Sequence, residues 1–343
     1  MSVALAPRRF AVAPGVRFSG GRALAILSVL GLCMVAALLA SAVLGEYPLG
    51  LRRVLLEPLS VDATVFWRLR VPRAVLGAVV GAALGASGSA LQGLLKNPLA
   101  DPFILGVSGG AALGATLALA VGLTAFAGPS LFAFVGSLAA MGLVLAVGRT
   151  RRSPYAALLT GVIFNAFASA AITGIKTLIS PDRVGEILYW LAGSLGYESP
   201  RTLAGAAILQ VACVGVLWRQ SGRLNLLSLG DEDASSLGVP VDRTRVVVLV
   251  ATSLSVAGAV ALSGLVGFVG LIVPHLLRLL VGPDQRLLVP ASALGGAAFL
   301  VLSDLLTRLL FPVFHAELPV GVVTAILGGP LFLYLLQRAE ART

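Results

Sequence analysis

The stretch RLRVPRAVLGAVVGAALGASGSALQGLLKNPLADP, residues 68–102, decides how the chain folds. Residues 74–95 contain no charged side chain, and that length suffices for an α-helix to cross the hydrocarbon core of a bilayer. Three glycines recur every four residues on one face of this helix, which is typical of close packing in lipid: Gly77, Gly81 and Gly85. The proline-rich segment 96–102 then predicts a turn, because proline cannot continue a helix.

Comparable apolar segments recur from one end of the chain to the other. The 343 residues are 58% hydrophobic and only 12% charged, with a mean hydropathy of +0.98. A soluble domain has about 25% charged residues. The composition therefore predicts an all-α membrane protein with about ten spans, at roughly 23–44, 74–95, 103–122, 125–147, 155–178, 202–218, 246–263, 264–281, 287–307 and 318–336.

These spans imply one membrane domain, 23–337, between an N-terminal tail, 1–22, and a C-terminal tail, 338–343. An A-x-A pattern at 40–42 leaves a cleaved signal peptide open, but the apolar stretch before it is longer than the usual core of such a peptide, which favours a retained helix. Ten spans place both termini on the same side. Most of the 25 basic residues fall in segments on that side, which predicts that it is the cytoplasm.

An acidic island, GDEDASSLGVPVDR at 230–243, lies between the sixth and seventh spans, on the predicted inner side. Acids in its first turn suit a helix dipole, and glycine and proline end the helix, which we expect at about 229–240. A helix this short needs a packing partner. On the outer side, 181–195 has apolar residues at helical spacing and a Tyr-Trp pair, which predicts an interfacial helix that does not span.

The sequence gives little support for a catalytic function. Cys33 and Cys213 lie inside apolar spans and indicate neither a disulfide framework nor a metal site. The two lysines, Lys96 and Lys176, are in no phosphate-binding loop, so any ATP that drives the protein is bound by another chain. The net charge of +10 is explained by basic loops that orient helices, without nucleic acid. We therefore expect a membrane protein that binds no cofactor or metal itself.

The chain resembles the permease subunits of ABC importers for iron–siderophore complexes, haem and cobalamin (the FecCD/BtuC type). The most specific block is residues 68–115, and SLGDEDASSLGV, ALSGLVGFVGLIVPHLLRLLVGPD and ELPVGVVTAILGGPLFLYLL follow it in the family's order and spacing. The resemblance runs from about 66 to 337, while the first 65 residues are similar to the family only in general character. It implies a type II importer fold with ten helices per subunit, a homodimer in a bacterial inner membrane.

The resemblance also implies partners on both sides of the bilayer. Two copies of a separate ATPase, which carry the ATP and magnesium, bind inside, and a periplasmic or lipid-anchored solute-binding protein delivers cargo outside. The acidic island then corresponds to the coupling helix that seats in the ATPase. The residues expected there are Gly230, Asp231, Glu232, Asp233, Leu237 and Gly238. From the residues alone, a solvated loop whose acids only aid solubility explains the island equally well.

Three arginines stand at outer ends of predicted spans, where basic residues are disfavoured: Arg70, Arg73 and Arg308. Simple snorkelling to the interface is one explanation. The resemblance implies another, because its members use arginines at these positions to receive acidic side chains of the binding protein; only Val71 departs from the motif's usual leucine. Asp304, one helical turn before Arg308, is costly to bury alone, and we expect the two to pair.

Polar side chains in the fifth span are candidates for a translocation pathway: Thr160, Asn165, Ser169 and Thr173. In lipid such groups face protein or water, although hydrogen bonds between helices explain them as well. Both histidines are weaker candidates. His275 lies in a stretch that the family shares across cargoes, which favours a structural role. His315 lies on the outer side, where contact with cargo in transit is an alternative, and Glu317 and Pro319 beside it predict a capped start of the tenth span.

The favoured cargo is an iron–siderophore chelate, with haem second and cobalamin third, a ranking based only on how often the family handles each. The rival function is an ion-coupled secondary transporter that works alone. Such a protein needs paired acids or broken helices in mid-membrane, and Asp304 is the only candidate acid that the sequence offers for that role. A membrane-embedded enzyme is a third interpretation, but the sequence offers neither the nucleophile–base pair nor the metal cluster that such an enzyme needs.

Overall fold

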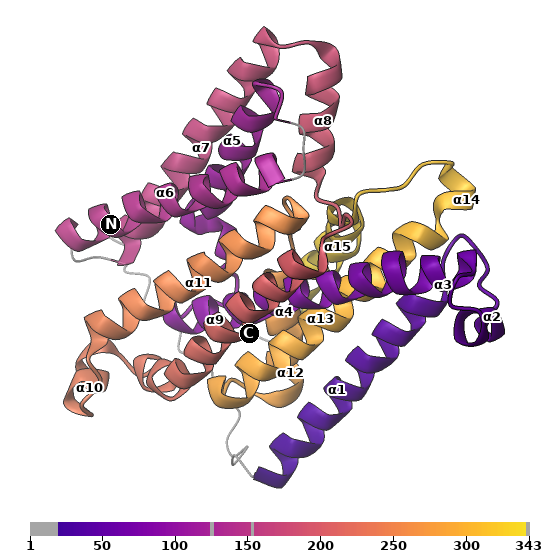
Figure 1. Ribbon diagram of the computed structural model, residues 1–343. Helices are drawn as coiled ribbons and strands as arrows, with labels where there is room; N and C mark the ends of the chain where they lie inside the picture. Colours follow the sequence, from indigo (N-terminus) through magenta and orange to yellow (C-terminus); the bar gives the residue numbers. More distant parts are fainter. Residues whose placement is uncertain (1–19, 124–126, 152–153, 341–343) are drawn as a thin grey trace.

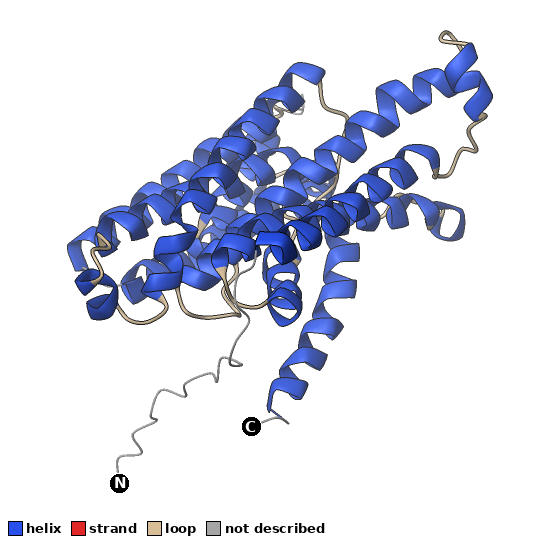
Figure 2. Cartoon of the chain, turned by 90° about the horizontal axis from the view of Figure 1, so that it is seen from below, coloured by secondary structure: helices blue, strands red, loops and turns tan. Residues whose placement is uncertain are grey.

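The computed structural model describes residues 20–123, 127–151 and 154–340, and every regular element in these ranges is helical (Figure 2). Within these ranges, seven helical segments are long and apolar enough to cross a bilayer, and three apolar helices are shorter. The helices concerned are α1 (Gly20–Val43), α4 (Val71–Leu94), α5 (Val107–Ala120), α6 (Ala127–Arg151), α7 (Pro154–Leu178), α9 (Pro200–Leu227), α11 (Val241–Ser263), α12 (Val269–Val281), α13 (Gln285–Leu309) and α15 (Val320–Glu340).

These ten helices correspond one to one with the predicted spans, but several boundaries differ. The third and eighth, α5 and α12, contain only 14 and 13 residues, fewer than the roughly 20 that a spanning helix needs. Each follows a break: the short turn η2 (Pro102–Leu105) precedes α5, and residues 264–268 separate α11 from α12. In the other direction, α3 (Val61–Thr64) and η1 (Val65–Arg70) continue into α4 and start that segment much earlier than expected.

Helix α4 lies at the centre of the bundle, in contact with α9, α11, α12 and α13 (Figure 1). Glycine permits the closest of these approaches. A Cβ added at Gly81 would lie 2.2 Å from the carbonyl oxygen of Gly296, and one at Gly85 would lie 2.1 Å from that of Ser292, both on α13. No other residue fits at that separation, so the glycine repeat of residues 77–85 is a packing feature, as the sequence indicated.

Short helices gather at the two ends of the bundle. Helices α2 (Leu51–Leu56), α3 and α14 (Phe311–Phe314) lie together at one end, and α10 (Asp231–Ser236) lies at the other (Figure 1). Helix α8 (Pro181–Ala192) falls within the segment predicted to be interfacial and contacts α5 and α15. We refer to the end with α10 as the inner end and to the end with α2 and α14 as the outer end.

Much of the apolar surface of the single chain is open. Helix α1 buries only four residues, and leucines such as Leu32 and Leu39 are exposed along it. Helix α15 leans away from the other helices toward its C-terminal end (Figure 2), and Leu333 there is 62% exposed. In water such a surface would be unstable. In a bilayer, lipid or a second protein copy covers it, because lipid tails are as apolar as leucine.

Candidate functional site

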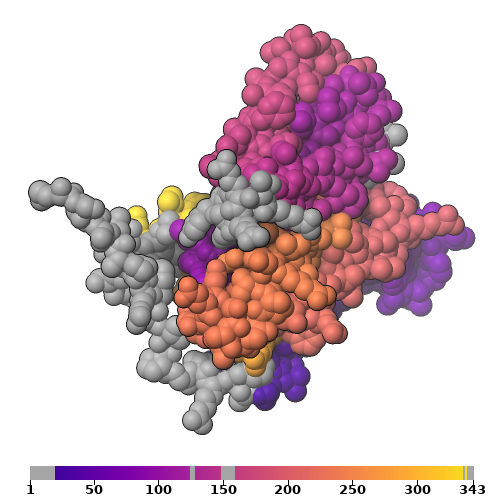
Figure 3. Space-filling view, turned by 90° about the vertical axis from the view of Figure 1, so that its left-hand side faces the viewer, coloured from indigo at the N-terminus to yellow at the C-terminus, as the bar shows by residue number. Residues whose placement is uncertain are grey.

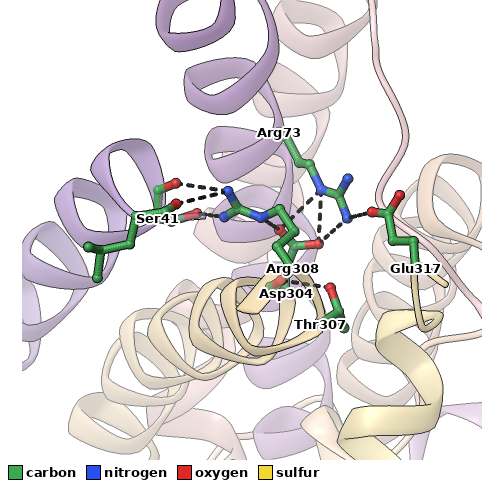
Figure 4. Close-up of polar contacts among 7 residues, drawn as sticks. Ser41, Arg73, Asp304, Thr307, Arg308 and Glu317 are labelled. Atoms are coloured by element: carbon green, nitrogen blue, oxygen red, sulfur yellow. Dashed lines mark hydrogen bonds and ion pairs between the residues drawn. The ribbon is translucent and has the colours of Figure 1, made fainter. Parts of the chain in front are cut away.

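Two clusters of polar residues occupy opposite ends of the bundle, and the outer one is built around Arg73 in the first turn of α4. Its guanidinium donates three hydrogen bonds to the carboxylate of Asp304 on α13, at 2.8–3.1 Å (Figure 4). The same group lies 2.5 Å from a carboxylate oxygen of Glu317, just before α15. Arg73 therefore joins α4 to two later parts of the chain.

The other two arginines hold the end of α1. Arg308, in the last turn of α13, lies 3.3 Å from Asp304 and donates to the hydroxyl and carbonyl oxygens of Ser41, at 2.5 and 3.1 Å (Figure 4). Arg70 donates to the carbonyl oxygens of Val43, at 2.6 Å, and of Tyr47. The last carbonyls of a helix have no partner inside it, and these guanidinium groups supply one.

Together these contacts form an outer arginine network of Arg70, Arg73, Arg308, Asp304 and Glu317. The expected pairing of Asp304 with Arg308 is confirmed. The pairing of Asp304 with Arg73 was not predicted from the sequence. A usable signal was present, since a buried carboxylate at that end requires compensation by nearby cations.

The burial of the arginines bears on their expected role in docking. Arg70 is 6% exposed, and the side chains of Arg308 and Arg73 are 12% and 20% exposed. Of the three, Arg73 retains the most contact with solvent. Docking through these residues stays a prediction, and the structure adds a second role for them within the fold.

The inner cluster is the acidic island, where α10 begins after Gly230. This glycine has φ +144°, a conformation that other residues rarely adopt. Asp231 accepts a hydrogen bond from Arg245 at the start of α11, and its other oxygen lies 3.6 Å from Lys96 in the turn after α4. Ala234 is fully buried. One face of α10 is thus fixed to the membrane helices.

The opposite face of α10 is open to solvent. Glu232, Asp233, Leu237 and Gly238 are all exposed, and Figure 3 looks onto this orange part of the surface. Burial raises the pKa of Asp231, but the hydrogen bond and charge of Arg245, with those of Lys96, outweigh it and hold the pKa below its ordinary value. Asp231 is therefore an anion that two cations of the chain already pair with, although its side chain is 47% exposed, while the next two acids are available to a partner.

The fifth-span candidates lie on α7 in different surroundings. Asn165 accepts a hydrogen bond from the Gly109 amide and donates one to the Phe103 carbonyl, both at 3.1 Å, so it connects α7 to the η2–α5 junction. Ser169 and Thr173 are exposed in the single chain, and the Thr173 hydroxyl donates to the Ser169 carbonyl at 2.9 Å. Thr160 is half-buried. The structure thus gives Asn165 a packing role.

Sequence reasoning missed Glu198, in the loop before α9. It is 4% exposed, and its Oε1 has no hydrogen-bond partner in the described part of the chain. Burial raises its pKa to about 7. Nothing in the local sequence, GYESP, distinguishes it from an ordinary loop acid, because its burial depends on distant helices.

The family of the chain follows from comparisons with known proteins. The model of the FecCD transport family matches residues 32–338. A cobalamin import permease, BtuC of Halobacterium salinarum, is 37% identical over 95% of this chain and 100% of its own length. A hemin transport permease, HmuU of Yersinia pestis, is 41% identical over 91% of this chain and 95% of its own.

Two further matches agree. An iron chelatin transport permease of Helicobacter pylori is 37% identical over 83% of this chain and 86% of its own. The fold matches a solved inward-facing structure of an ABC transporter assigned to the metal-chelate type, with a TM-score of 0.81 and 33% identity over 92% of this chain and 99% of the other. The chain therefore belongs to the FecCD transport family, as a membrane permease of an ABC importer of the FecCD/BtuC type.

Proposed function

We propose that this chain is the permease of a binding-protein-dependent importer that carries an iron–siderophore chelate across a bacterial inner membrane by ATP-driven alternating access. Two copies form the pathway, and both termini face the cytoplasm. Two ATPase subunits bind ATP and magnesium at the inner end. The chain itself performs no covalent chemistry; it converts movement of the ATPases into movement of helices.

The observation that carries the proposal is the construction of α10. Asp231 and Ala234 fix the helix to α11 and to the turn after α4, while Glu232, Asp233 and Leu237 remain exposed. A short helix that is anchored on one face and open on the other can transmit a rigid-body displacement to the helices that hold it. Arg245 and Lys96 would receive that displacement, since they pair with Asp231.

At the outer end, we propose that the binding protein docks over the arginine network, with the partly exposed Arg73 nearest to it. The cargo passes between the two copies, past Ser169 and Thr173 on the open face of α7. The relatives described above are named for cobalamin import, hemin transport and iron chelatin transport. An iron chelate is the preferred cargo because it is the commonest in the family, and haem and cobalamin are the alternatives.

Reconstitution tests this function directly. The chain would be co-purified with its cognate ATPase and placed in proteoliposomes with the cognate binding protein. We expect ATP-dependent uptake of a ferric siderophore that stops when either partner is omitted. Uptake by the permease alone without ATP would contradict the importer mechanism. ATP-dependent uptake of haem or cobalamin in place of the siderophore would support the mechanism but contradict the proposed cargo.

A further inference from the structure

The two carboxylates that hold Arg73 differ in burial. The Asp304 side chain is 1% exposed, whereas that of Glu317 is 42% exposed. Nη2 of Arg73 lies 2.8 Å from Asp304 and 2.5 Å from Glu317, so one nitrogen serves both acids. Breaking a buried ion pair leaves an uncompensated charge, while an exposed pair adds little stability. Glu317 is therefore the acid that Arg73 can exchange.

The backbone around Glu317 permits such an exchange. Residues 315–319 join α14 to α15 without regular structure. Within the described chain, no amide of residues 316–318 donates a backbone hydrogen bond. His315, where the segment starts, adopts a left-handed conformation with φ +52°. Glu317 can thus leave Arg73 without the loss of a helical hydrogen bond.

The charge balance of the network favours a replacement for Glu317. Two arginines, Arg73 and Arg308, face the two carboxylates, so these charges balance. Removal of Glu317 alone would leave an excess of one positive charge beside Asp304. An arginine fork matches a carboxylate in shape as well as charge. Because Arg73 is partly exposed at a surface, a carboxylate on the surface of another protein can reach it.

We propose that Glu317 is an internal substitute for an acidic side chain of the docking protein. In the free permease Glu317 forms an ion pair with Arg73. On docking, the partner's carboxylate takes its place, while Asp304 remains bound. This inference rests on the proposed docking at the outer end and specifies which contact is exchanged.

The exchange has a structural consequence for α15. The Arg73–Glu317 pair ties α4 to the segment that leads into α15, and α15 in turn contacts α12 and α13. Docking would cut that tie, while the hydrogen bond from the Gly321 amide to the Gly193 carbonyl would still hold the start of α15. The effect of docking would thus extend to the segment between α14 and α15.

The test is association of the cognate solute-binding protein with the permease–ATPase complex in nanodiscs at low ionic strength. Glu317→Gln removes the competing charge, and Glu57→Gln is the matched control, because Glu57 is an exposed acid at the same end of the bundle. We expect Glu317→Gln to tighten association about threefold more than the control does, on the scale of one partly exposed ion pair. The advantage should shrink at high salt.

A third variant separates the two levels of the proposal. Arg73→Lys keeps a charge for Asp304 but loses the fork, so we expect weaker association and no further gain when Glu317→Gln is added. If Glu317→Gln behaves like the control while Arg73→Lys still weakens association, docking stands and the exchange is wrong. If Arg73→Lys leaves association unchanged in a folded complex, Arg73 does not receive the binding protein, and both docking through it and the exchange fail.

Discussion

Asp304 holds a negative charge between two guanidinium groups, from Arg73 and Arg308, with almost no contact to solvent. Asp304→Asn keeps its shape but removes the charge that both arginines face. We expect the variant to lose up to about 3 kcal/mol of stability, the lower end for a broken buried pair, because Arg73 keeps some solvent contact. Thermal unfolding in detergent measures the loss. Glu317→Gln, at the exposed end of the same network, should cost less than about 1 kcal/mol.

The stability of the chain is expected to depend on pH through Glu198. Its folded-state pKa of about 7 lies above the ordinary value of 4.5, so the folded chain holds a proton that the unfolded chain has released between these values. Stability linked to Glu198 therefore falls as pH rises from about 4.5 through 7. Glu198→Gln should melt at a higher temperature than the wild type at pH 8 and at the same temperature near pH 4.5. An equal difference in melting temperature between the variant and the wild type at both pH values would show that burial does not penalise the charged carboxylate.

The positions of these charges were predictable, but their partners were not. Arg70, Arg73 and Arg308 were identified because positive residues are unusual at outer ends of spans. That argument treats each arginine alone and leads to an exposed docking residue. The hydrogen bonds to Val43, Tyr47 and Ser41 depend on how α1 lies against α4 and α13. Sequence spacing gives such information only within one helix, as for Asp304 and Arg308.

At the scale of elements, hydropathy located the helices and misjudged their ends. The apolar run 103–122 looked like one span, but η2 and α5 divide it, since the chain breaks at Gly106 with φ +80°. In α4 the opposite error arose: charged residues at 68–73 suggested a boundary, yet helical structure continues back to Val61. Hydropathy shows which segments are apolar enough to face lipid, whereas the ends of α4 and α5 depend on hydrogen bonds and packing within the bundle.

Helix α10 allows a prediction that separates its two faces. Glu232→Gln with Asp233→Asn changes only the exposed face, so we expect weaker binding of the ATPase and an unchanged melting temperature of the isolated permease. Asp231→Asn removes the partner of Arg245 and Lys96, so the ATPase should still bind, but less cargo should be carried per ATP hydrolysed. Co-purification and paired uptake and hydrolysis assays distinguish the two. Identical behaviour of both variants would mean that α10 acts as an undivided acidic patch.

At the scale of the whole molecule, the polar clusters lie at opposite ends of a bundle with an apolar exterior. Helices of 23–25 residues, such as α11 and α13, are about 35 Å long at 1.5 Å per residue, enough to cross the roughly 30 Å hydrocarbon core. The arginine network and α10 therefore fall near opposite membrane surfaces. The function proposed here requires the network to face outward and α10 to face the ATPases.

That orientation predicts which positions a membrane-impermeant thiol reagent reaches in intact spheroplasts. Leu59 at the outer end is 99% exposed and Leu237 beside α10 is 59% exposed, so both suit cysteine substitution once the native Cys33 and Cys213 are replaced by alanine. Leu59→Cys should label in intact spheroplasts, and Leu237→Cys only after lysis. The excess of basic residues in loops at the α10 end supports this direction, because such loops stay in the cytoplasm. The reverse pattern would place α10 where no ATP-hydrolysing partner could bind it, and would refute both the coupling and the docking roles.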